Sequence, residues 1–145
     1  MEPADSHNLE RFIAAQHGIF DIALRELQSG SKQSHWMWFV FPQLVGLGQS
    51  STAIFFGIRS LDEARAYLAD PLLGPRLHQA VAALLPWAGE CSPESIFGDI
   101  DALKLRSSLT LFDCVAPSDI FAKALNSLFA GEPDARTLAL ISGAR

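Results

Sequence analysis

The chain has 145 residues, a length typical of one domain with a sizeable core. Its composition, 49% hydrophobic and 19% charged, argues against intrinsic disorder. The net charge of −5 and the lack of any Lys/Arg cluster argue against binding to a nucleic-acid backbone. No apolar run approaches the ~18 residues of a membrane span.

The polar, acidic N-terminus is not a secretory signal, so we expect a cytoplasmic protein without a membrane partner. The cysteines and histidines lack metal-ligand spacing, and we expect no metal or cofactor.

The first half of the chain predicts three helices. Apolar residues recur at helical intervals over residues 8–27, and Ser29-Gly30 reads as the end of that helix. Residues 36–41 are all large and apolar, so periodicity cannot distinguish a buried helix from a buried strand. We favour a short helix there because no partner strand is evident. Ser60 and Glu63 have the spacing of a capping box, in which each side chain accepts a hydrogen bond from the other's backbone N–H.

In the second half, Pro, Gly, Ser and Asp separate segments with helical periodicity. Helices are expected after the capping box and then over residues 75–85, 92–98, 99–112, 120–129 and 135–141. The sequence therefore predicts a mainly α fold, a compact single-domain bundle of about six to seven helices with irregular topology, spanning residues 1–145.

Residues 34–48 hold the most distinctive motif of the chain. They contain Ser34-His35-Trp36-Met37-Trp38, Phe41-Pro42-Gln43-Leu44 and Gly46-Leu47-Gly48. This motif resembles the core signature of a bacterial family, domain of unknown function 1810. Three other stretches also resemble that family: Arg11-Phe12 with Ala15-Gln16, residues 63–74, and residues 104–112, where Leu109 replaces a commoner Met. The resemblance implies a mostly helical single domain and no established activity. Members are sometimes labelled calpastatin, but such an inhibitor is a disordered polar segment, unlike this chain.

His35 is the first candidate for chemistry, because an imidazole changes charge near neutral pH and can act as an acid or a base. The flat faces of Trp36 and Trp38 could stack on an aromatic ring of a ligand. The alternative is that both tryptophans fill the core and His35 hydrogen-bonds to a backbone carbonyl. Gln43 could bind a polar ligand edge, or it could belong to a turn formed by the glycines that follow it.

A second polar cluster consists of Lys104, Ser107 and Ser108, which share one face of the predicted helix at spacings of three and four residues. A lysine in such a helix either points to solvent or binds an anion. Gln16 lies in the middle of the first helix, where a polar side chain is usually solvated. It becomes a candidate through its match to the family's Ala-Gln pair.

These residues lead to a hypothesis about a pocket. One segment would supply His35, Trp36, Trp38 and Gln43, and the other would supply Lys104, Ser107 and Ser108. A nucleotide or ADP-ribose-like molecule would suit this mixture, and a loose likeness of the helical layout to a family linked with NAD and ADP-ribose metabolism suggests the same ligand. As an enzyme, the protein would hydrolyse or transfer at a glycosidic bond, with His35 as general acid or base and Lys104 holding phosphate. The alternative is a non-catalytic module that binds a protein or a small ligand.

Overall fold

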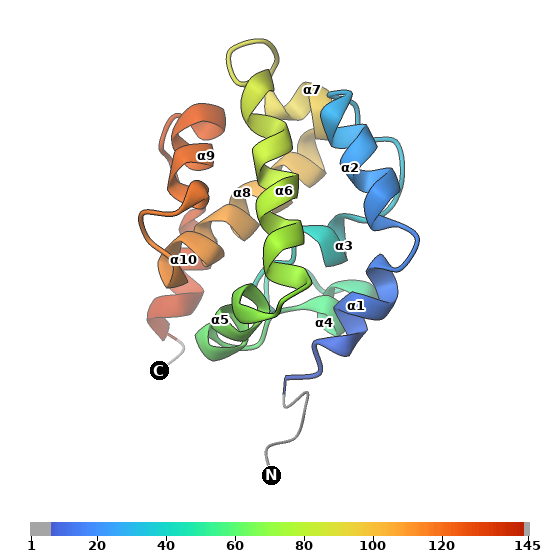
Figure 1. The fold of residues 1–145 in the computed structure, drawn as a ribbon. Helices are drawn as coiled ribbons and strands as arrows, with labels where there is room; N and C mark the ends of the chain where they lie inside the picture. Colours follow the sequence, from blue (N-terminus) through green and yellow to red (C-terminus); the bar gives the residue numbers. More distant parts are fainter. Residues whose placement is uncertain (1–6, 144–145) are drawn as a thin grey trace.

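The protein is described here by a computed structural model covering residues 7–143, in which the helices pack around a shared core (Figure 1). Within those residues there are ten α-helices, one 3₁₀ helix (η1) and no strand; their bounds are α1 Glu10–Gln16, α2 Phe20–Gln28, α3 Met37–Val40, α4 Ser51–Phe56, α5 Leu61–Ala69, α6 Leu73–Leu84, η1 Leu85–Trp87, α7 Pro93–Phe97, α8 Asp99–Val115, α9 Ile120–Phe129 and α10 Ala135–Gly143. An isolated parallel bridge joins Leu44 to Ile58. The prediction of a mainly helical fold is confirmed.

The structure has ten α-helices in the described residues where six to seven were predicted, and two of the additional helices have local causes. Gly18 has φ +73°, a left-handed conformation that interrupts the predicted 8–27 helix, so that α1 and α2 form separately. An additional short helix, α4, begins where the Ser50 side chain accepts a hydrogen bond from Ala53 N at 3.1 Å. Residues 36–41 do contain a helix, α3, as favoured from the sequence.

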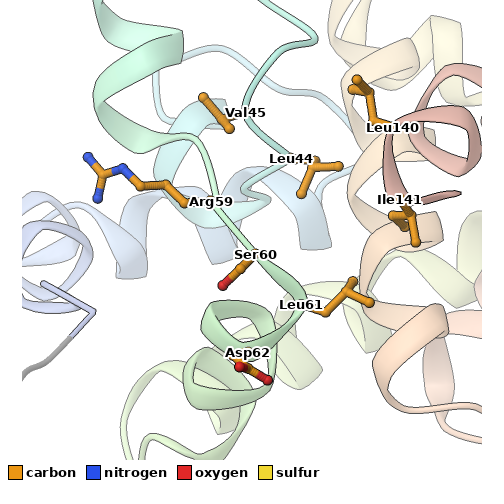
Figure 2. A pocket seen from close by; sticks show the side chains of 8 residues that line it. All are labelled: Leu44, Val45, Arg59, Ser60, Leu61, Asp62, Leu140 and Ile141. Atoms are coloured by element: carbon orange, nitrogen blue, oxygen red, sulfur yellow. The ribbon is translucent and has the colours of Figure 1, made fainter. Parts of the chain in front are cut away.

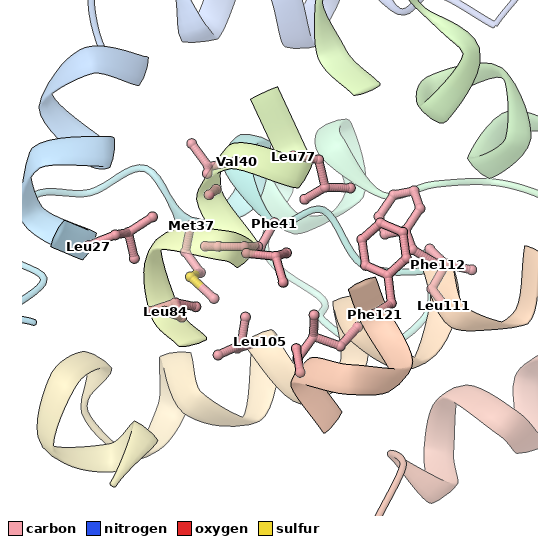
Figure 3. Close-up of a cluster of buried hydrophobic side chains, with 14 of the residues drawn as sticks. Leu27, Met37, Val40, Phe41, Leu77, Leu84, Leu105, Leu111, Phe112 and Phe121 are labelled. Atoms are coloured by element: carbon pink, nitrogen blue, oxygen red, sulfur yellow. The ribbon is translucent and has the colours of Figure 1, made fainter. Parts of the chain in front are cut away.

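Two long helices organise the core. Figure 1 shows α6 in the middle of the view with α2 and α9 on either side, and α6 also packs against α5. Behind it, α8 packs against α5, α7, α9 and α10. Figure 3 shows apolar side chains from these helices and from α3 meeting in the interior, among them Met37, Leu77, Leu105 and Phe112. Full burial of each such side chain stabilises the fold by about 1.5–3 kcal/mol.

Gly74, near the start of α6, permits the close contact between α5 and α6. A Cβ atom at this position would lie 2.1 Å from the backbone oxygen of Leu68. Backbone cannot yield as a flexible side chain can, so any larger residue would force the two helices apart.

The N-terminal helix is held by a buried ion pair. Arg11 contacts Glu63 at 2.5 Å, and the exposed fractions of the two side chains are 1% and 2%. Arg11 also donates hydrogen bonds to Phe55 O at 2.8 Å and Gly57 O at 3.0 Å. The capping box is formed only in part. Glu63 N donates to the Ser60 side chain, but the Glu63 carboxylate accepts from Arg59 N rather than from Ser60 N. The carboxylate thus caps α5 and pairs with Arg11 at once.

No helix in the part of the chain that the structure describes is both long and apolar enough to cross a lipid bilayer.

Candidate functional site

Four of the predicted site residues line a cleft of about 380 Å³, here called the Lys104 cleft. It lies between α3, the loop over residues 43–50, α4, α8 and the start of α10. The predicted residues in its lining are Trp38, Gln43, Lys104 and Ser107, and the others are Leu47, Gly48, Gln49, Ser50, Ala53, Ile100, Leu103, Asp134 and Arg136. Trp38 and Gln43 from one segment thus lie in the same cleft as Lys104 and Ser107 from another segment far along the sequence.

Lys104 is positioned by an aromatic ring and a carboxylate. Its Nζ lies 4.4 Å from the centroid of the Trp38 ring, a distance at which the cation is attracted by the π-system. The nearest carboxylate oxygen, Asp101 Oδ1, is 3.6 Å away, which is longer than a charge-assisted hydrogen bond. The ammonium group is thus held near the cleft without a tight ionic partner.

Arg136 is the second cation of the cleft, and it extends from the first turn of α10. Among the described residues its side chain has one hydrogen-bond partner, Leu47 O at 3.2 Å. The carboxylate beside it, Asp134, already accepts hydrogen bonds from Thr137 N at 2.8 Å and Thr137 Oγ1 at 2.7 Å, as the cap of α10. The lining therefore holds two cations and one carboxylate, and so a net charge of +1, in a protein whose net charge is −5.

Neutral polar groups and an apolar rim complete the lining. In residues 7–143 the Gln43 side-chain amide has no hydrogen-bond partner, so its donors and acceptor are available. Ser107 is less available because its hydroxyl donates to Leu103 O at 3.1 Å. Two apolar side chains of α8 line the cleft while remaining open to solvent, Ile100 with 71% and Leu103 with 58% of its surface exposed.

The structure does not bring His35 or Trp36 into the cleft. His35 is exposed in the turn before α3 and is not among the lining residues. Trp36 is 0% exposed, and its Nε1 donates to Glu26 Oε1 at 2.8 Å. Trp36 therefore lies in the core. It is the non-helical residue that precedes α3, whereas Trp38 belongs to the helix and lines the cleft, so the two side chains differ in their surroundings.

Glu26 holds the segment before α3 in place. Its carboxylate accepts hydrogen bonds from Gln33 N at 2.8 Å, Ser34 N at 3.0 Å and Ser34 Oγ at 2.6 Å, in addition to Trp36 Nε1. Partial burial acts to raise the pKa of Glu26, but these hydrogen bonds stabilise the charged form and lower the pKa to about 2. This carboxylate is therefore a structural acceptor rather than a proton donor.

Ser108 and Gln16 also lie outside the cleft. Ser108 is 1% exposed, and its Oγ has no hydrogen-bond partner among the described residues. The cleft-facing side of α8 is defined by Ile100, Leu103, Lys104 and Ser107. At ~100° per residue, Ser108 lies about a quarter of a turn from the middle of that side, where α8 is buried against the core. Gln16 is 1% exposed and belongs to a buried network, in which it donates to Phe39 O at 2.7 Å and accepts from Arg76 Nη1 at 3.1 Å.

The sequence analysis missed Arg136, and a signal for it existed. Cations in the first turn of a helix oppose the helix dipole, so they are unfavourable there unless another contact compensates. Arg136 is the second residue of α10, directly after the Asp134 cap. This unfavourable position is the one local signal for Arg136; that α10 packs against α8 beside the cleft depends on tertiary structure.

A second cavity, of about 320 Å³, lies between α5, α10 and the segments joined by the Leu44–Ile58 bridge (Figure 2). None of the predicted site residues lines it. Figure 2 shows the Arg59 guanidinium directed away from Leu140 and Ile141, which line the other side. Two of its three polar lining residues already stabilise α5, since Ser60 caps that helix and Asp62 pairs with Arg65 at 2.9 Å. This cavity offers fewer free polar groups than the Lys104 cleft.

Comparisons with known proteins place the chain in a family. The model of a family of proteins of unknown function, DUF1810, matches residues 6–141. The chain belongs to the DUF1810 family. The crystal structure of a conserved hypothetical protein from Mycobacterium tuberculosis has the same fold, with a TM-score of 0.90 and 46% sequence identity over 97% of this chain and 99% of that chain. No curated protein matches the chain.

The DUF1810 motif at residues 34–48 divides into two parts in this structure. Ser34 and Trp36 bind the Glu26 carboxylate and fix the start of α3. Trp38, Gln43 and Gly48 line the Lys104 cleft. At Gly48 a Cβ atom would lie 2.8 Å from the Cβ of Ala53, so glycine allows the loop to pack closely against α4. The first part of the motif thus fixes the position of α3, and the second part lines the cleft. In the described part of the DUF1810 chain, no three His, Cys, Asp or Glu side chains gather as a potential metal site.

Proposed function

We propose that the Lys104 cleft binds a small anionic molecule, of the class of nucleotides or ADP-ribose derivatives. The observation that carries this proposal is the pair of cations Lys104 and Arg136 in the lining of one cleft of a net-negative protein. Neither cation has a carboxylate oxygen within hydrogen-bond distance among residues 7–143. A phosphate or carboxylate group entering the cleft would gain two charge-assisted contacts without first breaking a strong ion pair.

The remaining lining supports a ligand with more than a charged group. The free amide of Gln43 can both donate to and accept from a polar edge. The exposed side chains of Ile100 and Leu103 offer apolar area that a sugar or a base can cover. Because Lys104 already lies over the Trp38 ring, a sandwich of two tryptophans around a ligand ring is not proposed. A ring would instead lie along the α8 rim.

The cleft favours binding over hydrolysis at a glycosidic bond. General acid–base chemistry needs a titratable group within hydrogen-bond reach of the reacting atoms. His35 lies outside the cleft lining, and Asp134, the one carboxylate among the described lining residues, serves as the cap of α10. We therefore favour the non-catalytic alternative, in the form of a ligand-binding protein.

A thermal-shift titration tests the proposal. Wild type is heated with inorganic phosphate, AMP, NAD and ADP-ribose, and with uncharged adenosine as the comparison. A ligand present at ~100 times its Kd adds about 2.7 kcal/mol of stability, which raises Tm by several degrees in a domain of this size. We expect stabilisation by at least one anionic compound and its loss in Lys104→Gln and in Arg136→Gln.

The matched control is Lys123→Gln, which removes the same charge from an exposed position on α9, away from the cleft. It should retain the wild-type shift. The proposal is wrong if no anion stabilises wild type, or if Lys123→Gln loses as much of the shift as Lys104→Gln. The non-catalytic assignment is tested separately by incubating the protein with NAD and ADP-ribose. Release of nicotinamide or ribose phosphate that Asp134→Asn abolishes would contradict it.

A further inference from the structure

A row of alternating charges connects the Lys104 cleft to the interior of the protein. Asp101, one helical turn before Lys104 on α8, lies between two lysines. Its Oδ2 is 3.0 Å from Lys32 Nζ, and its Oδ1 is 3.6 Å from Lys104 Nζ. The carboxylate thus uses different oxygens for the two cations and binds Lys32 more closely.

Lys32 is held in a fixed position outside the cleft. Its side chain is 7% exposed, and its Nζ donates to Ser34 O at 2.5 Å. The ammonium also lies 4.8 Å from the centroid of the Trp36 ring, which is itself fully buried. A hydrogen bond from the backbone N–H of Lys32 to Ile96 O, at 2.9 Å, fixes the main chain. Because these contacts hold the Lys32 ammonium in place, it neutralises the Asp101 carboxylate throughout.

The Lys32–Asp101 ion pair changes the charge that an incoming anion meets beside the cleft. Asp101 is 21% exposed and would, without Lys32, place an unbalanced negative charge beside the cleft and compete with the ligand for Lys104. With Lys32 in place, the three groups carry a net positive charge. Trp38 keeps the Lys104 ammonium over its ring, so its position does not depend on a tight ion pair with Asp101.

We infer that Lys32 and Asp101 are positioning residues of the Lys104 cleft: Lys32 neutralises Asp101 so that Lys104 is free to bind the ligand's anionic group. This inference rests on the proposed function, since it explains how the same cleft is tuned for an anion. Neither Lys32 nor Asp101 lines the cleft. Their effect on the ligand is exerted through Lys104.

The test compares three variants by NMR titration with inorganic pyrophosphate at constant ionic strength. Lys32→Met keeps the length of the buried side chain but removes its charge, and should weaken binding about fivefold, a typical size for a partly exposed ion pair. Asp101→Asn removes the competitor and should tighten binding about fivefold. The double variant, in which both charges are absent, should bind within about twofold of wild type.

This pattern distinguishes positioning from structural damage, because loss of structure would weaken binding in all three variants. Amide spectra without ligand verify that each variant is folded. Lys32→Arg, which keeps the charge, is the comparison for Lys32→Met. The inference is overturned if Lys32→Met binds like wild type, if Asp101→Asn does not bind more tightly, or if the double variant is the weakest. If wild type binds neither pyrophosphate nor any nucleotide, the proposed function itself is wrong and this inference falls with it.

Discussion

Replacing Glu26 with Gln should destabilise the protein in a strongly pH-dependent way. The carboxylate accepts four hydrogen bonds from the segment that precedes α3, at 2.6 to 3.0 Å. Glutamine has nearly the same shape, but it removes the charge and offers one acceptor oxygen where two are used. The variant therefore tests the charged acceptor itself rather than the packing around it.

The expected loss of unfolding free energy follows from the pKa of Glu26. Folding lowers the pKa of Glu26 from 4.5 to about 2, and at ~1.4 kcal/mol per pH unit this corresponds to at most ~3.4 kcal/mol. Because the side chain is only half-buried, solvent screening reduces the value, and we expect about 2 kcal/mol at pH 7. A lowered pKa stabilises the fold fully above pH 4.5, and this contribution disappears as the pH falls towards 2.

Urea denaturation of wild type and Glu26→Gln at pH 7, 5.5 and 4 measures this effect. The difference in unfolding free energy should be constant between pH 7 and 5.5 and should shrink at pH 4. Glu90→Gln, an exposed residue in the loop before α7, is the matched control and should differ from wild type by less than ~0.5 kcal/mol. The reasoning is refuted if Glu26→Gln is as stable as wild type at pH 7, or if its deficit is the same at all three values.

Three further variants test other contacts. Arg11→Met should cost ~3–5 kcal/mol because it leaves the Glu63 carboxylate buried without a partner, and the double variant Arg11→Met, Glu63→Leu should cost less than the sum of the single ones; additive losses in chemical denaturation would contradict the coupling. His78 is partly buried, which lowers its pKa, but its hydrogen bond to a backbone carbonyl and its contact with Asp119 at 3.0 Å outweigh this and raise it. His78→Gln should therefore cost up to ~1 kcal/mol below pH 6.5, and this difference should vanish as the pH rises above the folded pKa; a deficit that grew with pH would show the opposite sign. Gly74→Ala should lower stability by about 3 kcal/mol or more, because its Cβ would meet a backbone oxygen at 2.1 Å, and an unchanged Tm would show that α5 and α6 can separate freely.

Local chemistry made much of the helical pattern predictable. Ser60 caps α5, Ser92 caps α7 and Pro117-Ser118 separates α8 from α9, each as the residue types suggest. What could not be predicted depends on distant contacts. Gly18 takes a left-handed φ and splits the first helix, but the apolar periodicity continues on both sides of it and so does not indicate this break. The Glu63 carboxylate turned towards Arg59 N because it also pairs with an arginine 52 residues earlier.

The residues of the candidate site were also predictable only in part. Helical spacing grouped Lys104 with Ser107, and composition singled out Trp38, but a periodic pattern does not state which face meets the core. Trp36 and Trp38 look equivalent in the sequence, yet one is buried and the other borders the cleft. Arg136 joins the site because α10 packs against α8, and that contact is set by tertiary structure.

The Arg11 contacts also constrain the order in which the chain can assemble during synthesis. Arg11 hydrogen-bonds to Phe55 O, Gly57 O and Glu63, which follow it by 44, 46 and 52 residues. A chain emerging from the ribosome has none of these acceptors when α1 appears. These three contacts therefore cannot form until the start of α5 has been synthesised, so an anchor of the earliest segment to be made is among the later contacts to be completed.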